Sequence, residues 1–222
     1  MNGSMRLTLT VLLVVIILIF GLVIGRQIFM AESREPSPAP DLSGINVYVH
    51  DQARPLADFR LQDENGDPIT PAELKGHWTF AFVGYTNCPD ICPIAMASLK
   101  KTDGLLPATL PQPEYWLITA DPEHDTPAKL KEYVGFYGED FHGATGEMSE
   151  LRALAKSLGA TFVQREVEGD LLVDHSGHFA LINPEGEMAA VFQPPHSPEN
   201  IADAFRKIYE WARANHPRAS GS

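Results

Sequence analysis

A continuous apolar stretch, Trp78 to Val83, leads through a small-residue turn into Cys-Pro-Asp-Ile-Cys-Pro at positions 88–93, and this segment limits the possible folds more than any other. Such a run predicts a strand that is buried on both faces. A proline follows each cysteine directly, which suits the start of a helix, where backbone N–H groups lack intrahelical partners. The segment therefore predicts a strand, a turn and a helix, with Cys88 near the N-cap and Cys92 one turn later on the same face.

The surrounding segments alternate between strand and helix patterns. We expect a β-hairpin at 57–70 around Asn65-Gly66, further strands at 115–120, 162–167 and 171–173, a second hairpin at 179–192, and helices at 93–106, 126–137, 149–158 and 197–213. This order predicts an α/β sandwich of the thioredoxin type with an N-terminal β-hairpin extension. In that fold, the reactive or ligand-binding residues lie in the loop after a central parallel strand.

The N-terminal segment predicts a membrane helix. Leu7 to Gly25 is apolar and uncharged, between Arg6 and Arg26, and about 20 such residues cross the hydrocarbon core. A cleaved signal peptide is the alternative, but the run is longer than a typical signal core and is followed by a poor cleavage site. We expect residues 1–30 to anchor the chain in a bacterial-type inner membrane as a single pass, with the following domain facing the periplasm.

Residues 31–43 predict a semi-rigid linker, because three prolines alternate with small residues there. A single domain is expected at 44–216, followed by a flexible tail at 217–222. The chain has 29 acidic and 17 basic residues. This balance argues against a nucleic-acid partner, which would require clustered Lys and Arg.

The chain contains two cysteines, Cys88 and Cys92. A helix N-terminus favours their thiolate forms, which bind soft ions such as Cu(I) or close into a disulfide. Three interpretations compete: a structural disulfide, a thiol–disulfide catalyst and a metal site. Catalysts of this fold usually have two residues between the cysteines, rather than three, and carry a proline facing them, which the stretch 173–178 lacks. A metal site requires a further ligand.

Two of the eight histidines, His175 and His178, precede the hairpin strand that lies opposite this helix in a thioredoxin sandwich. Position favours His175, in the turn Asp174-His175-Ser176-Gly177, over His178 at the strand start. Asp174 could orient the His175 ring. Two thiolates and one imidazole suit Cu(I) and are also usable by Cu(II), whereas zinc usually takes a fourth ligand.

Three segments together resemble the Sco/SenC family of membrane-anchored copper proteins. They are Gly-Tyr-Thr-Asn-Cys-Pro-Asp-Ile-Cys-Pro at 84–93, Asp-Pro-Glu-His-Asp-Thr-Pro at 121–127 and Val-Asp-His-Ser at 173–176, with weaker agreement around 58–59, 141–146 and 181–186. The resemblance implies a thioredoxin-like fold in which Cys88, Cys92 and His175 bind copper. It favours His175 over His178, because only His175 falls on the family's Asp-His-Ser segment. The chain departs from the family pattern at Asn87 and His124.

The resemblance also implies a function. The expected role is a copper metallochaperone, not an enzyme, that delivers copper to the dinuclear centre of cytochrome c oxidase subunit II, or to another copper-accepting protein, or prepares the acceptor's thiols. Cys88 and Cys92 would form a redox disulfide and could support accessory thiol–disulfide oxidoreductase activity. A reductase that carries no copper and a copper or redox sensor are the alternatives. Asp121 is either a neighbour of the copper site or a residue at a helix entry.

Overall fold

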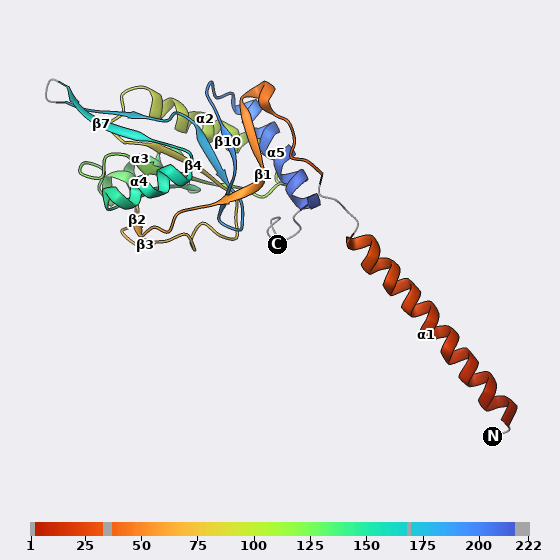
Figure 1. Ribbon diagram of the computed structural model, residues 1–222. Helices are drawn as coiled ribbons and strands as arrows, with labels where there is room; N and C mark the ends of the chain where they lie inside the picture. Colours follow the sequence, from red (N-terminus) through yellow and green to blue (C-terminus); the bar gives the residue numbers. More distant parts are fainter. Residues whose placement is uncertain (1–2, 33–36, 168–169, 216–222) are drawn as a thin grey trace. The chain divides into compact units, whose positions relative to one another are not determined.

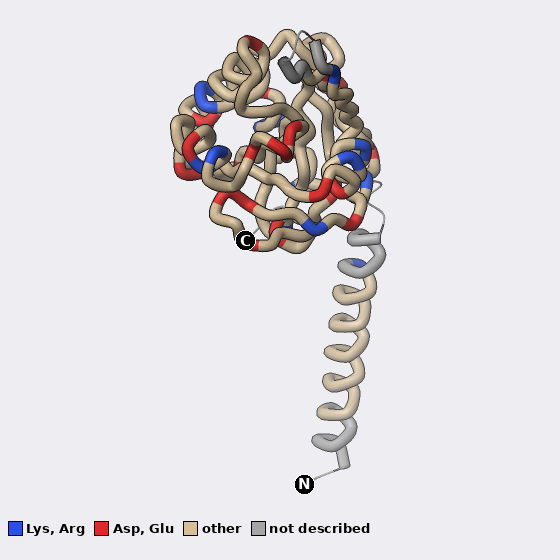
Figure 2. The backbone as a smooth tube through the Cα atoms, turned by 90° about the vertical axis from the view of Figure 1, so that its left-hand side faces the viewer, with Lys and Arg blue, Asp and Glu red and all other residues tan. Residues whose placement is uncertain are grey.

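The N-terminal part of the chain is one long helix. The structure, a computed structural model, describes the backbone of residues 3–32, 37–167 and 170–215, so the predicted tail 217–222 and linker residues 33–36 lie outside the described residues. Met1–Ser37 and Pro38–Ser222 form two compact units. Helix α1 (Gly3–Glu32) makes up most of the first (Figure 1). Its segment Leu9–Arg26 has a mean hydropathy of 2.8, long and apolar enough to cross a membrane, and shows no charge before Arg26 (Figure 2).

The second unit is built on a mixed sheet. Its strand order in the described residues is β1-β10-β9-β4-β5-β6-β2-β3, while β7 and β8 form a separate antiparallel pair. Strands β4, β5 and β6 run parallel, and the remaining pairs are antiparallel. The strands are β1 (Val47–Pro55), β2 (Leu61–Asp63), β3 (Pro68–Ile69), β4 (Thr79–Gly84), β5 (Glu114–Thr119), β6 (Phe141–Thr145), β7 (Phe162–Val167), β8 (Asp170–His175), β9 (Phe179–Ile182) and β10 (Glu187–Phe192).

The centre of the sheet carries the core. All six residues of β4 are buried, as the apolar run predicted. Phe80, Tyr115 and Phe141 are register neighbours on β4, β5 and β6, and their rings stack at centroid distances of 5.8 and 4.5 Å. Phe205 packs against Phe80 from α5 at 5.8 Å. This aromatic layer packs the N-terminal ends of the three parallel strands, and the loops of the candidate site extend from their opposite ends.

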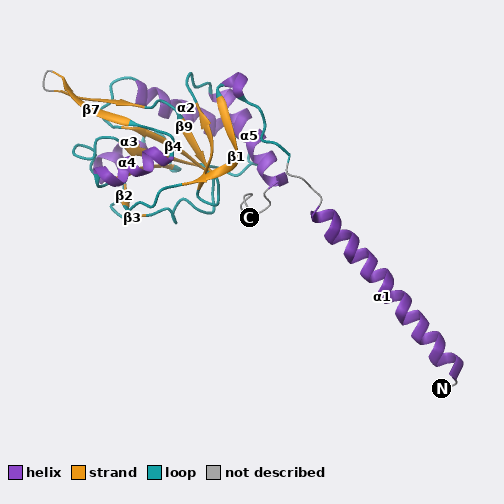
Figure 3. Ribbon diagram, in the orientation of Figure 1, coloured by secondary structure: helices purple, strands orange, loops and turns teal. Residues whose placement is uncertain are grey.

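In the described part of the second unit, the helices that accompany the sheet (Figure 3) are α2 (Ile91–Leu105), α3 (Pro127–Gly135), α4 (Met148–Ser157) and α5 (Pro198–Asn215). The predicted start of α3 is confirmed, because the Thr126 hydroxyl accepts a hydrogen bond from the Lys129 backbone N–H at 3.3 Å. Contacts join α2 to α5, α3 to β6, and α4 to β5. The predicted α/β sandwich of the thioredoxin type is therefore confirmed.

The buried face of α2 leaves out two of its large apolar residues. Ile94 and Leu105 are 62% and 49% exposed. The helix begins at Ile91, before the predicted start at residue 93, and its inward row follows helical spacing from Cys92. The buried residues of α2 are Cys92, Ala95, Met96, Leu99 and Thr102.

Other differences concern the extent and pairing of individual strands. The hairpin around Asn65-Gly66 is present as β2 and β3, but it extends the main sheet through β2 and β6. Strand β1 occupies a stretch for which no strand was predicted and pairs with β10. Strand β6 was also not predicted. Strand β8 continues to His175, beyond the predicted end at residue 173, so His175 ends a strand and does not lie in the following turn.

Candidate metal centre

The two cysteines meet at the N-terminus of α2, but not on one helix face as predicted. Asp90 is the N-cap residue, so Cys92 lies in the first turn and Cys88 lies in the preceding turn, outside the helix. The chain folds back over the helix start, and the Cys92 backbone N–H lies 3.4 Å from the Cys88 Sγ. A helix terminus with unpaired N–H groups therefore faces this sulfur.

Burial distinguishes the two thiols. Cys92 is fully buried, and this burial raises the pKa of its thiol. Cys88 is half-buried. Burial alone would raise the pKa of Cys88, but the backbone N–H groups of Asp90, Cys92 and Ile91 stabilise its thiolate and bring the pKa below the ordinary value. Cys88 is consequently the more reactive of the two sulfurs.

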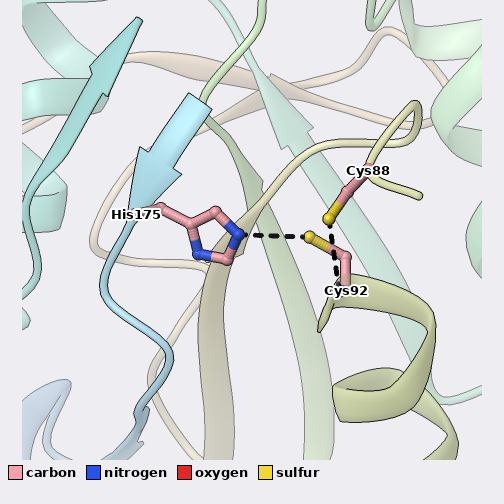
Figure 4. A group of neighbouring side chains, drawn as sticks. All are labelled: Cys88, Cys92 and His175. Carbon is pink, nitrogen blue, oxygen red and sulfur yellow. Dashed lines mark hydrogen bonds between the residues drawn. The ribbon is translucent and has the colours of Figure 1, made fainter. Parts of the chain in front are cut away.

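His175 reaches the cysteines from the end of β8 (Figure 4). Its Nε2 lies 3.4 Å from the Cys92 Sγ, and its Nδ1 lies 3.2 Å from the Ser176 carbonyl oxygen. A carbonyl only accepts hydrogen bonds, so this contact places a proton on Nδ1 and leaves the Nε2 lone pair directed at the sulfur. Burial lowers the pKa of His175, although the hydrogen bond to the Ser176 carbonyl acts in the opposite direction and raises it. The ring is therefore suited to act as a neutral ligand.

The three donor atoms form a compact group. The two Sγ atoms and a ring nitrogen of His175 all lie within 4.8 Å of one another, and no other described residues form such a group of three. Phe82 and Tyr85 meet the imidazole edge-to-face, at centroid distances of 5.5 and 6.2 Å. A cavity of about 280 Å³, lined in part by Tyr85, Cys88 and His175, borders the group. The site thus has one buried sulfur and two donors next to open space.

The two carboxylates considered as neighbours of the site have other partners in the structure, and Asp121 lies in the turn that leads into α3, the alternative placement for this residue. Asp174 pairs with Arg165, and the Ser176 carbonyl takes the orienting contact with His175. Asp121 is buried, and both of its carboxylate oxygens lie 3.0 Å from the His124 Nδ1. The alternative ligand His178 is also buried, and its Nε2 contacts the Leu158 carbonyl at 3.1 Å.

Asp125 is a buried carboxylate to which the sequence analysis gave no role. It accepts hydrogen bonds from the Thr86 N–H at 3.1 Å, the Thr86 hydroxyl at 2.5 Å and the Thr119 hydroxyl at 2.6 Å. These bonds join the turn before Cys88 to the end of β5. In the sequence, Asp125 lies in the family segment 121–127 and directly precedes the Thr126 helix cap, but neither feature indicates a contact with Thr86.

Comparison with known proteins identifies the family. The sequence model of the SCO1/SenC family matches residues 49–210. The chain belongs to this family. The match includes Cys88, Cys92 and His175, and it confirms the resemblance carried by the three sequence segments.

Relatives of this chain occur in bacteria and in eukaryotes. A Stutzerimonas stutzeri protein whose name assigns it copper binding is 41% identical over 181 residues, covering 79% of this chain and 89% of that protein. The mitochondrial SCO2 homolog of Danio rerio is 30% identical over 217 residues, covering 92% and 74% respectively.

Two solved structures share the fold of this SCO1/SenC chain. Arabidopsis thaliana ScoI with copper bound has a TM-score of 0.65 at 28% identity, covering 69% of this chain and 98% of that one. Yeast Sco1 with copper bound has the same TM-score and identity, covering 75% and 97%. These similarities agree with the thioredoxin-like architecture.

Proposed function

We propose that this protein is a membrane-anchored copper metallochaperone in which Cys88, Cys92 and His175 bind one copper ion. The observation that carries the proposal is the convergence of two sulfurs and one imidazole nitrogen within 4.8 Å. Two thiolates and one imidazole form a soft, three-coordinate donor set that suits Cu(I) and also accepts Cu(II). Support also comes from the S. stutzeri relative, named for copper binding, and from two similar proteins solved with copper bound.

The unequal burial of the donors suggests an order of ligand exchange. Cys92 is fully buried, whereas Cys88 and His175 are partly exposed next to the cavity. An incoming thiolate can therefore displace His175 or Cys88 while Cys92 retains the ion. Copper then passes to the acceptor without release into solution.

The acceptor in this proposal is cytochrome c oxidase subunit II, where the chain delivers copper to the dinuclear centre or prepares its thiols. Membership of the SCO1/SenC family supports this role. Helix α1 holds the domain at the membrane in a single pass, with the domain on the extracytoplasmic side; its Leu9–Arg26 segment is apolar enough for this. Closure of a Cys88–Cys92 disulfide would remove both thiolates and block copper loading.

A thiol–disulfide reductase is the second candidate. Its support is the pairing of a half-exposed thiol of lowered pKa, Cys88, with a buried thiol, Cys92, of raised pKa. An accessible thiolate attacks a partner disulfide and a neighbouring thiol then resolves the mixed disulfide. Such a reductase needs both cysteines but has no need of His175.

The deciding experiment is an anaerobic Cu(I) titration of the reduced full-length protein in detergent, read by metal content and X-ray absorption. We expect one copper per chain with two sulfur ligands and one nitrogen ligand. His175→Ala should weaken binding by at least about 10–100-fold, the loss that follows replacement of a residue that merely supports a ligand. His124→Ala, which changes an exposed histidine, is the matched control.

Two outcomes would contradict the chaperone proposal. Full copper retention with unchanged spectra in His175→Ala would exclude the ligand assignment. No binding below micromolar copper, together with undiminished reduction of a partner disulfide by His175→Ala, would favour the reductase. Transfer to the copper domain of subunit II, monitored by its absorption, would test the acceptor separately.

A further inference from the structure

A second cluster of histidine and glutamate side chains lies at the opposite end of the main sheet. His77 precedes β4, Glu114 begins β5, and His142 is the second residue of β6. Because these strands are parallel, their first residues lie at the same end of the sheet. The cysteines lie beyond the other end, after β4. The cluster is therefore separate from the copper site.

Glu64, which follows β2, orients the ring of His142. The Glu64 side chain is only 10% exposed, its Oε1 lies 3.1 Å from the His142 Nδ1, and its Oε2 accepts the Gly143 N–H at 3.0 Å. The carboxylate accepts from Nδ1–H, which leaves the Nε2 lone pair free on the other side of the ring. A carboxylate that holds one nitrogen of a histidine is the usual support for a metal-binding imidazole.

The free nitrogens of both histidines approach one oxygen of Glu114. Its Oε2 lies 3.1 Å from the His77 Nε2 and 4.0 Å from the His142 Nε2, and it accepts the Trp116 indole N–H at 2.9 Å. The His77 Nε2 is buried and lies at ion-pair distance from this oxygen, although the two groups are not aligned as a regular hydrogen bond. A buried ring nitrogen beside a carboxylate, without a properly directed hydrogen bond, has unused capacity to bind a cation.

We propose that His77, Glu114 and His142 bind a divalent first-row ion of the Zn²⁺ or Cu²⁺ type. Two imidazole nitrogens and one carboxylate oxygen form a donor set that zinc uses in proteins, with an open fourth position. Metal–ligand bonds of about 2.0–2.1 Å place donors in a tetrahedron roughly 3.3 Å apart, close to the 3.1 Å between Glu114 and His77. As they stand, the ring nitrogens of His77 and His142 are too far apart for the three donors to form a group as compact as that of the cysteines and His175. Metal binding therefore requires the 4.0 Å contact with His142 to shorten and the two imidazoles to rotate towards each other.

Charge and exposure also favour a divalent ion. Two carboxylates, Glu64 and Glu114, face two imidazoles that are neutral when they bind a metal, so a 2+ charge balances the cluster. The side chains of His77, Glu114 and His142 are 26%, 31% and 27% exposed, which leaves a path from solvent. No thiolate is among these donors, so the cluster should prefer divalent ions over Cu(I).

The test uses the full-length protein in detergent with Cys88→Ser and Cys92→Ser, so that the thiolate site cannot contribute. Zn²⁺ binding is measured by isothermal titration calorimetry. We expect one Zn²⁺ per chain, and a decrease in affinity of at least about 10–100-fold on adding His77→Gln, Glu114→Gln or His142→Gln. Glu64→Gln should weaken binding by about 10–100-fold, since it removes the support of His142. His124→Gln, in the same background, should change nothing.

A second measurement avoids dependence on the folding of those variants. In the double-serine protein, two-dimensional NMR of the ¹⁵N-labelled imidazoles should show Zn²⁺ shifting the Nε2 signals of His77 and His142. Co²⁺ should give the visible bands of a nitrogen and oxygen site without sulfur charge transfer. Absence of Zn²⁺ binding, or binding with neither imidazole shifted, would overturn the proposal. Failure of Cu(I) binding at Cys88 and Cys92 would leave it unaffected.

Discussion

Asp125→Asn tests whether the buried carboxylate holds the turn that carries Cys88. Asp125 is fully buried, and its two oxygens accept three hydrogen bonds, two from Thr86 and one from Thr119. Asparagine has nearly the same shape but lacks the charge and replaces one acceptor oxygen with a donor. The substitution therefore weakens these bonds without creating a cavity.

The magnitude follows from the number of bonds. A hydrogen bond to a charged group contributes about 1.5–3 kcal/mol and a neutral one about 1 kcal/mol, so three bonds that lose their charge should cost roughly 3 kcal/mol. The neutral amide is easier to bury, which reduces the net loss in unfolding free energy to about 2–3 kcal/mol. For a domain of this size each kcal/mol lowers Tm by about 2–4 °C. We expect Tm to fall by roughly 4–12 °C.

The assay is thermal unfolding of full-length protein in detergent, followed by near-ultraviolet circular dichroism. The three tryptophans, at 78, 116 and 211, all lie in the second unit, so the signal reports on that unit. Asp90→Asn is the matched control, because Asp90 is exposed in the same turn and its side chain makes no capping hydrogen bond. Equal and small Tm changes in the two variants would refute the assignment of Asp125 as the residue that holds this turn.

Three further predictions concern the same end of the sheet. Iodoacetamide at neutral pH should alkylate Cys88 well before Cys92, because Cys88 is half-exposed with a lowered pKa while burial raises the pKa of Cys92; equal labelling by mass spectrometry would contradict this. Gly84→Ala should cost about 1–3 kcal/mol of unfolding free energy and weaken copper binding, because its Cβ would lie 2.9 Å from the Cys92 Sγ; unchanged denaturation and copper affinity would refute it. The hydrogen bond with Asp121 raises the pKa of His124, so its contribution to stability is full below the unfolded value of 6.5 and is lost as pH rises through the raised value. NMR should show this pKa return to the ordinary value in Asp121→Asn.

The central strands were predictable because their burial leaves a strong local signal. β4 is apolar throughout, and the hairpin of β9 and β10 has a polar turn between apolar runs. β6 gave no such signal. It contains Gly143, and a Cβ there would lie 2.9 Å from the Leu130 side chain of α3. The small residue makes room for the helix, so tertiary packing decides the conformation of this strand.

The candidate copper site was predictable in its residue types but not in its local geometry. The spacing of Cys88 and Cys92 indicated a helix start, but it could not show that the turn places Cys88 outside the helix. The family resemblance favoured His175. The group that orients its ring is the backbone carbonyl of Ser176, and every residue has such a carbonyl, so the sequence could not predict this contact. Asp125 and Thr86 are 39 residues apart in the sequence, so no local sequence pattern predicts the hydrogen bonds between them.

The two proposed sites should separate ions by their chemistry, because they lie at opposite ends of the same parallel strands and share no donor type except imidazole. The thiolate pair favours Cu(I), whereas the cluster of His77, Glu114 and His142 favours divalent ions. Reduced protein should therefore bind one Cu(I) without oxygen, and the Cys88→Ser, Cys92→Ser variant should lose that Cu(I) while retaining one Cu²⁺. Electron paramagnetic resonance of the variant should show nitrogen hyperfine coupling that disappears in His142→Gln. If the double-serine variant binds neither ion, all metal binding by this chain depends on the thiolates, and the second site does not exist.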